Sequence, residues 1–409
     1  MKNKLTILLL LTLFKVTPTF AQIDTAFWFA APWVTPDHAA RHPIKVHIAT
    51  FAAPFTTVEL RQPAAIAPNQ YDTTIIIPAN SVFDYTFWRD GAATNSNRGW
   101  DSLEVRPANQ VVPYGLYFSS TSNISIAYDV ITTGNNPETM SLKGQNGLGT
   151  EFVVPHQNQW QNQFRGDIAN TPPGVFQPKQ QINLVGTKPN TVVWITPKCN
   201  IIGHPANITY SILLVNPGDA YTLENTVQTT FVPGNNLSGT IISSNKPIAV
   251  TTADDSVRNP SGGCHDLIGD QIVPVEIVGK DYILNKGAMN AGALEGGYIV
   301  GTENFTSVQI TNALSVVTNT IINKGQTYFY PVTTPMSYVQ SDKSVYCYQA
   351  DGIGCEAGSA ILPPLSCAGS SLVAFSRNQP NLFYLNILCK NGAQNSFTIN
   401  GSTTLIPGT

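Results

Sequence analysis

The side chains best suited to chemistry lie in one polar stretch, residues 244–284. Its ionisable and thiol side chains include Asp254, Asp255, Cys264, His265, Asp266 and Asp270. Calcium prefers oxygen ligands, so several carboxylates on one loop could hold it. The stretch has no D-x-[DN]-x-[DN]-G loop, and acidic residues in such segments commonly cap turns through backbone amides. We therefore do not favour calcium and expect no cofactor.

Catalysis by these residues is disfavoured by geometry. Asp254 and Asp255 are adjacent, and neighbouring residues of a strand point to opposite faces, so they make a poor acid–base pair. Cys264 and His265 are also adjacent, whereas a nucleophile and its base must lie within hydrogen-bond reach beside a third, orienting group. The chain has no G-x-S-x-G, Walker or H-E-x-x-H motif. We expect no enzyme activity and keep Asp254, Asp255, His265 and Asp266 as candidate ligand-binding residues.

Aromatic residues beside amides are a further candidate for recognition. Trp160 precedes Gln161, Asn162 and Gln163. Such a ring supplies apolar contact area while the amides fix the orientation of a sugar or peptide, so Trp160 joins the candidate ligand-binding residues, with core packing as the alternative. Trp194 alternates with Val193 and Ile195, and we expect it in the core.

The chain has six cysteines, Cys199, Cys264, Cys347, Cys355, Cys367 and Cys389. Their spacings match no zinc pattern. Cys355 and Cys367 flank one loop and are the most plausible disulfide pair. Six cysteines allow 15 connectivities, so the other pairings stay open, and free buried thiols are the alternative.

The start of the chain and its low charge indicate where the protein works, and we expect the chain to be exported. Residues 1–21 read as a signal peptide, with Lys2 and Lys4, an apolar run from Leu5 to Phe14 and a small-residue site ending at Ala21. No later segment is long and apolar enough to span a membrane. Charged residues make up only 11% of the chain and the net charge is −3, which excludes a basic surface for nucleic acid. We expect a secreted or cell-surface protein.

Two blocks recur along the chain and predict a repeated β architecture. The hairpin pattern of residues 182–196 returns at 298–311, and the strand pattern of residues 244–250 returns at 341–347. Their alternation with period two is typical of half-buried strands. We predict an all-β fold of repeated antiparallel sheets that form one continuous body, with a β-propeller-like arrangement favoured over tandem β-sandwiches. The predicted units are residues 22–148, 149–278 and 279–370, and residues 371–409 form a partial fourth unit or closing strands.

The order of three motifs resembles the N-terminal domain of IgG Fc-binding proteins. The motifs are residues 246–250, residues 263–267 with Pro274 beyond them, and residues 279–282. The resemblance is strongest from Gly149 to Phe375, and many bacterial exported proteins carry the same domain. The family usually has Asp-His after the cysteine and two prolines beyond it, whereas this chain has His265-Asp266 and a single Pro274. The resemblance implies extracellular binding or adhesion; immunoglobulin itself is not favoured as the ligand.

These observations together predict an exported, non-catalytic binding or adhesion module. Loops of the repetitive β scaffold would recognise an extracellular protein or glycan, within a larger surface assembly or alone. Two alternatives stay open, a secreted polysaccharide-acting enzyme and a structural component of the cell surface. The enzyme would require two carboxylates across a cleft, about 5 to 10 Å apart.

Overall fold

The computed structural model describes the chain in ten ranges, which are residues 23–34, 44–66, 70–87, 102–130, 138–162, 178–225, 234–259, 264–369, 387–399 and 402–403. Regular structure in these ranges consists of strands and two short 3-10 helices, η1 (Gly144–Gly147) and η2 (Ala393–Ser396). None of the described residues forms a helix that could cross a membrane. The predicted signal peptide lies outside the described residues, as does most of the predicted fourth unit.

The first sheet is built on one long strand, β7 (Leu116–Val130). Its other members are β1 (Asp24–Phe29), β2 (Ile44–Thr50), β3 (Phe55–Arg61), β4 (Asp72–Pro78), β5 (Val82–Thr86) and β8 (Glu138–Ser141). The first half of β7 pairs with β1 and β3, and the second half pairs with β2 and β8. Alternation of apolar and polar residues explains this strand, because Ile124, Ile126 and Tyr128 are buried while the residues between them are partly exposed.

The second sheet repeats this arrangement around β15 (Ile241–Arg258). Its other members are β6 (Val111–Val112), β9 (Leu148–Val153), β10 (Gln161–Asn162), β11 (Gln180–Gly186), β12 (Thr191–Thr196), β13 (Tyr210–Leu214), β14 (Ala220–Glu224) and β16 (Asp266–Ile272). The start of β15 pairs with β12 and β9, its middle pairs with β11 and β16, and its end pairs with β10.

The third part of the chain forms two sheets. The first is β17 (Asp281–Asn285), β23 (Met336–Ser341), β20 (Thr306–Asn312) and β21 (Val317–Ile322). The second contains β18 (Ala288–Met289), β24 (Val345–Gly354), β19 (Gly296–Gly301), β22 (Thr327–Pro331) and β25 (Glu356–Ile361). Residues 342–344 separate β23 from β24. These two strands together correspond to the single long strand of each of the first two sheets, β7 and β15. A small hairpin of β26 (Thr398–Ile399) and β27 (Ser402–Thr403) follows.

One pairing scheme thus appears in three successive stretches of the chain. The first strand of each stretch, β1, β9 or β17, pairs with β7, β15 or β23. The last strand, β8, β16 or β25, pairs with β7, β15 or β24. All pairings between named strands are antiparallel except that of β18 with β24. The predicted all-β class with multiple antiparallel sheets is confirmed. The pairing does not show a propeller, and the unit boundaries stay a prediction.

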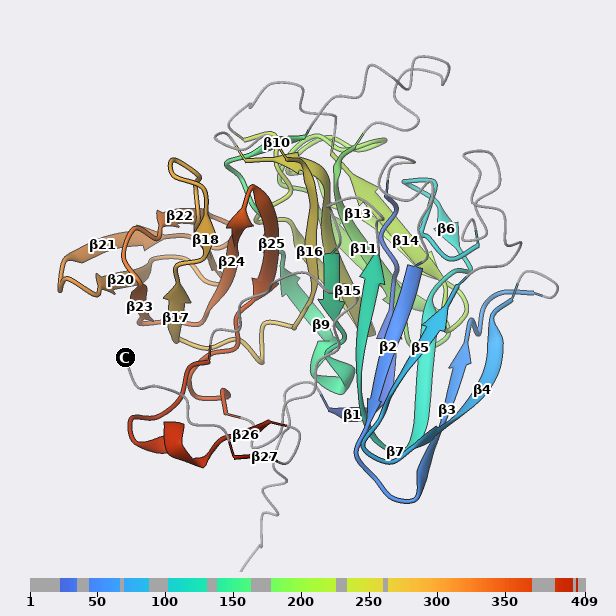
Figure 1. Ribbon diagram of the computed structural model, residues 1–409. Coiled ribbons are helices and arrows are strands. Elements are labelled where there is room, and N and C mark those ends of the chain that lie inside the picture. Colours follow the sequence, from blue (N-terminus) through green and yellow to red (C-terminus); the bar gives the residue numbers. More distant parts are fainter. Residues whose placement is uncertain are drawn as a thin grey trace, which may run out of the picture.

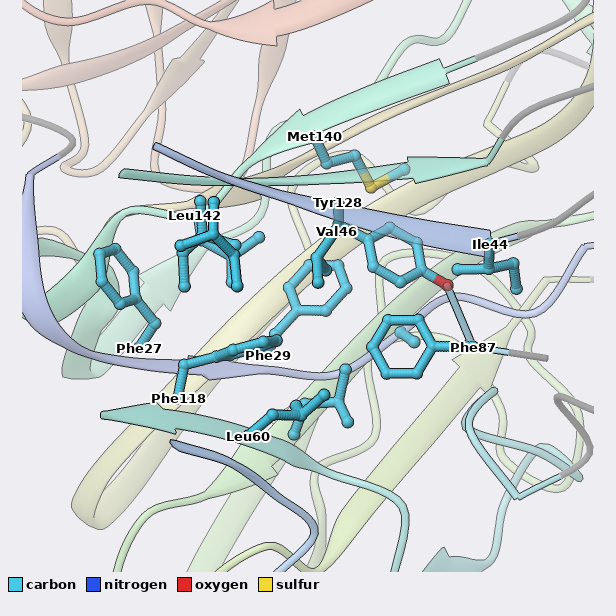
Figure 2. Packing of buried hydrophobic residues seen from close by; sticks show 14 of the residues in the cluster. Phe27, Phe29, Ile44, Val46, Leu60, Phe87, Phe118, Tyr128, Met140 and Leu142 are labelled. Atoms are coloured by element: carbon cyan, nitrogen blue, oxygen red, sulfur yellow. The ribbon is translucent and has the colours of Figure 1, made fainter. Parts of the chain in front are cut away.

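Apolar clusters fill the sheets and also join them. Figure 2 shows the cluster of the first sheet, in which Phe29 packs against Tyr128 with ring centroids 4.7 Å apart. This cluster extends to Ala253 and Leu267 of the second sheet. Another cluster joins Val257 of β15 to residues of β19 and β24. Each large apolar side chain buried in these clusters contributes about 1.5–3 kcal/mol to folding, so the sheets stabilise one another.

The strand β16 lies where the three stretches meet. It pairs with β15 and also contacts β25 and β8; β25, β16 and β15 are neighbours in Figure 1. All seven residues of β16 are buried, including Asp266 and Asp270. The polar side chains predicted to act as a site are therefore placed at the centre of the molecule.

Candidate functional site

Asp254 is the centre of a buried network of amides. Its Oδ2 accepts hydrogen bonds from Gln157 Nε2 at 2.6 Å and Gln180 Nε2 at 2.9 Å, and its Oδ1 accepts one from Asn162 Nδ2 at 2.6 Å. The three amides come from the segment after β9, from β11 and from β10. Burial raises the pKa of Asp254 to about 7, although the amide hydrogen bonds oppose this rise. The network fastens β10, β11 and the segment after β9 to Asp254 of β15.

Asp255 and Trp160 lie beside this network and are also buried. The pairing of β15 with β16 shifts register between Asp254 and Val257, which lets the adjacent carboxyl groups of Asp254 and Asp255 both lie inside. Trp160 is only 1% exposed and packs in the cluster that contains Val257. Of the two possibilities that the sequence left for Trp160, the structure shows core packing.

A disulfide joins the tip of the β15–β16 hairpin to the β24–β25 turn. It links Cys264 to Cys355. The predicted pair of Cys355 with Cys367 is wrong, because Cys367 is a free, exposed cysteine. Proximity in sequence favoured that pair, whereas the packing of β16 against β25 brings Cys264 to Cys355 from 91 residues away. Cys264, held in this bond, is not a nucleophile.

Asp266 lies next to the disulfide and shares its surroundings with Glu356. The Asp266 carboxylate accepts the backbone N–H of Ala357 at 2.9 Å. Burial and the neighbouring Glu356 raise the pKa of Asp266 to about 9. One ligand atom each from Cys264, Cys355 and Glu356 lie within 4.8 Å of one another, but disulfide sulfurs are not thiolates and bind metal poorly. His265 is half-buried beside this group.

Further buried ionisable side chains line the same central region, and two of them, Glu138 and Lys143, were missed from the sequence. Glu138 of β8 accepts the backbone N–H of Gly269 at 3.3 Å, and Asp270 accepts the backbone N–H of Ile361 at 3.0 Å. Lys143 donates to Asp270 at 3.0 Å. Carboxylates of one stretch thereby satisfy backbone groups of the next. Asp270 stood out in the sequence, but its partners are far away in the chain and had no local signal.

The outer face of the second sheet carries an exposed tryptophan. Trp194 of β12 is 41% exposed, so the expectation that it belongs to the core is wrong. Val193 and Ile195 are fully buried, and strict alternation places the residue between them on the opposite face. Trp194 lies between Ser211 of β13 and Ser243 of β15. Leu213 of β13, 49% exposed, is two residues from Ser211 and lies on the same face.

The outer face of the third part of the chain carries a row of amides. The exposed side chains of Gln340, Gln309 and Asn319 follow one another across β23, β20 and β21. Gln309 Nε2 donates to Asn319 Oδ1 at 3.1 Å. The half-buried ring of Tyr338 lies two residues from Gln340, and its hydroxyl donates to Asp281 at 2.8 Å. Exposed hydrogen-bonding groups thus lie beside an aromatic ring.

Comparison with known proteins gives one match. A family model described as IgGFc binding protein matches residues 138–409, a range that begins at β8 and includes the third part of the chain and every strand of the second sheet except β6. No curated protein and no solved structure matches the chain. The matched range is well over half of the 409 residues, and the chain therefore belongs to the IgGFc binding protein family.

Proposed function

We propose that this chain is an exported, non-catalytic binding module that contacts an extracellular protein through the outer face of its second sheet. The observation that carries the proposal is the exposed indole of Trp194, with Leu213 on the same face. Tryptophan is among the residues most enriched at energetic hot spots of protein interfaces. A protein partner also agrees with the family, whose description names the Fc part of immunoglobulin G.

The buried acids support a binding role over an enzymatic one. Asp254 and Asp266, the strongest candidates for acid–base work, are 0% and 3% exposed and accept hydrogen bonds from the scaffold. A polysaccharide-acting enzyme would need two carboxyl groups that reach a bound sugar. In this proposal Asp254, Asp255 and Asp266 position strands, and recognition belongs to the outer faces and loops.

The same proposal gives the three stretches of strands a common role. Units of residues 22–148, 149–278 and 279–370 would follow cleavage of a signal peptide after residue 21, and each would present one outer sheet face. The shared pairing scheme supports these boundaries. A structural role at the cell surface is the alternative, and it requires contacts between copies of the chain.

A glycan is the second candidate partner, and the amide row favours it. Gln309, Gln340 and Asn319 offer donors and acceptors on an exposed face, and Tyr338 offers part of a ring. Side-chain amides beside an aromatic ring suit sugar hydroxyl groups and the apolar face of a sugar ring. This face is separate in sequence from the Trp194 face, so the two candidates can be tested independently.

The test is binding by the purified mature chain. The probes are immobilised immunoglobulin G Fc, a panel of extracellular glycoproteins and a glycan array. If a protein binds, Trp194→Ala should weaken binding by about 30-fold, the equivalent of a hot spot of about 2 kcal/mol. Leu314→Ser, at a 74% exposed apolar position of the third part, is the matched control and should bind like the wild type.

The outcomes separate the candidates. Binding to glycans that Gln309→Ala abolishes and Trp194→Ala leaves intact would favour the second candidate. Binding to a protein that neither variant changes would exclude both faces. Hydrolysis of a polysaccharide by the wild-type chain would overturn the non-catalytic assignment.

A further inference from the structure

Lys143 and Asp270 form a buried pair between the first and second stretches of strands. Lys143 precedes η1, and Asp270 lies on β16, 127 residues later. Lys143 Nζ lies 3.0 Å from Asp270 Oδ2, and the two side chains are 7% and 4% exposed. Burying two opposite charges costs several kcal/mol each in desolvation, so this environment favours products that carry no charge.

Neighbouring groups hold both partners in place. Gln271 Oε1 accepts the backbone N–H of Lys143 at 2.6 Å. Asp270 Oδ1 accepts the backbone N–H of Gln271 at 2.8 Å, and Oδ2 accepts that of Ile361 at 3.0 Å. The preceding Leu142 is fully buried. The amine nitrogen is thus held 3.0 Å from one oxygen of a carboxyl group whose oxygens are polarised by N–H donors.

A third carboxyl group, that of Glu138 on β8, accepts the backbone N–H of Gly269, the residue before Asp270. Burial raises the pKa of Glu138 well above its usual value, and the charges of Asp270, Asp266 and Asp129 raise it further, although the N–H of Gly269 opposes this. These effects favour the protonated, uncharged form of the Glu138 carboxyl group. Burial also raises the pKa of Asp270, against the opposing effect of Lys143. A buried carboxyl group on the strand that contacts β16 can serve as a general acid and base.

We propose that Lys143 and Asp270 become joined by an intramolecular isopeptide bond. Transfer of one proton from Lys143 to Asp270 gives a neutral amine and a carboxylic acid. The Nζ lone pair attacks Cγ and forms the N–C bond. Glu138 donates a proton to Oδ2 and receives one from Nζ. The Cγ–Oδ2 bond then breaks and water leaves, so an amine and an acid become an amide and water without any oxidant.

The bond would add a second covalent connection at β16. The disulfide at Cys264 already links the β15–β16 hairpin to β25. An amide at Asp270 would link β16 to the segment that follows β8. All three stretches would then be connected by covalent bonds as well as by packing, as suits a module that works outside the cell.

The test measures the mass of the intact, reduced wild-type chain and maps its peptides. We expect a mass lower than the sequence mass by one water molecule, loss of tryptic cleavage after Lys143, and a branched peptide that contains Lys143 and Asp270. Lys143→Arg and Glu138→Gln should restore the full mass. Lys179→Arg is the matched control, because Lys179 forms a comparable buried pair with Glu224 at 2.9 Å; this variant should keep the mass deficit.

Asp270→Asn keeps the proposal testable if other variants fold poorly. An asparagine at this position can form the same amide with loss of ammonia. The mass of this variant should therefore be lower than its sequence mass by one ammonia molecule instead of one water molecule. Formation of the Cys264–Cys355 disulfide reports that each variant is folded. A wild-type chain with its full sequence mass would overturn the proposal, and so would a deficit that persists in Lys143→Arg.

Discussion

Replacement of Asp254 by asparagine should remove one defined part of the protein's loss of stability with rising pH. The pKa of Asp254 is about 7 in the folded chain against an ordinary value of 3.8. A carboxyl group whose pKa is raised on folding contributes its full stability below the unfolded pKa and loses it as the pH rises through the folded pKa. At 1.36 kcal/mol per pKa unit, the whole effect is about 4 kcal/mol, and about 2.7 kcal/mol of it falls between pH 5 and pH 9.

Asparagine resembles the protonated aspartic acid and does not titrate. The difference in free energy of unfolding between Asp254→Asn and the wild type should therefore move by about 2.7 kcal/mol in favour of Asp254→Asn between pH 5 and pH 9. Burial lowers the pKa of His156 to about 4, so this residue makes the free energy of unfolding change with pH in the opposite direction. Both proteins contain His156, and its effect therefore cancels when their free energies of unfolding are subtracted.

The assay is urea unfolding at pH 5 and pH 9 under non-reducing conditions. Asp72→Asn, at a carboxyl group that is 59% exposed, is the control and should keep the wild-type pH dependence. If Asp254→Asn and the wild type lose the same free energy between the two pH values, Asp254 is not a buried, protonatable group and the reasoning fails.

Three further predictions concern stability. Cys264→Ser should lower the free energy of unfolding by about 4 kcal/mol in non-reducing guanidinium, because the disulfide closes a loop of 91 residues, whereas Cys367→Ser should have no effect; equal midpoints for the two variants would contradict this. His47→Ala should cost about 3–5 kcal/mol at pH 6, because it leaves Asp129 buried without the His47 Nε2 contact at 3.0 Å. Burial lowers the pKa of His47, but hydrogen bonds to Asp129 and Asp84 raise it above 6.5 overall, so the cost should shrink as the pH rises through the raised value; a cost independent of pH would refute it. Ile195→Ala should cost about 2–5 kcal/mol in thermal unfolding, whereas Trp194→Ala should cost clearly less, and the reverse order would place Trp194 in the core.

Local pattern was enough to predict the class of the fold. Alternating apolar residues and frequent turn residues indicated strands, and the strands of the described residues pair antiparallel except β18 with β24. The same rule, applied strictly to Val193, Trp194 and Ile195, also gives the correct faces, because the neighbours of a buried strand residue point outward. The error at Trp194 came from assigning all three residues to one side.

The side-chain partners could not be predicted from the sequence, because they depend on contacts between distant strands. Cys264 meets Cys355 only because β16 packs against β25. Asp254 looked like a possible ligand-binding residue because it lies in a polar stretch, but Gln157, Asn162 and Gln180 bind it from two strands and the segment after β9. An acidic residue in a strand gives the same local signal whether it faces water or three buried amides.

The long central strands have a consequence for the order of folding. Phe29 of β1 pairs with Leu116 of β7, and Leu148 of β9 pairs with Ala249 of β15. The opening strand of each stretch must therefore wait for a partner that is synthesised much later, and contacts so far apart in sequence make folding slow. Slow closure of the sheets after synthesis would suit the proposed export, because an unfolded chain can pass through a narrow channel.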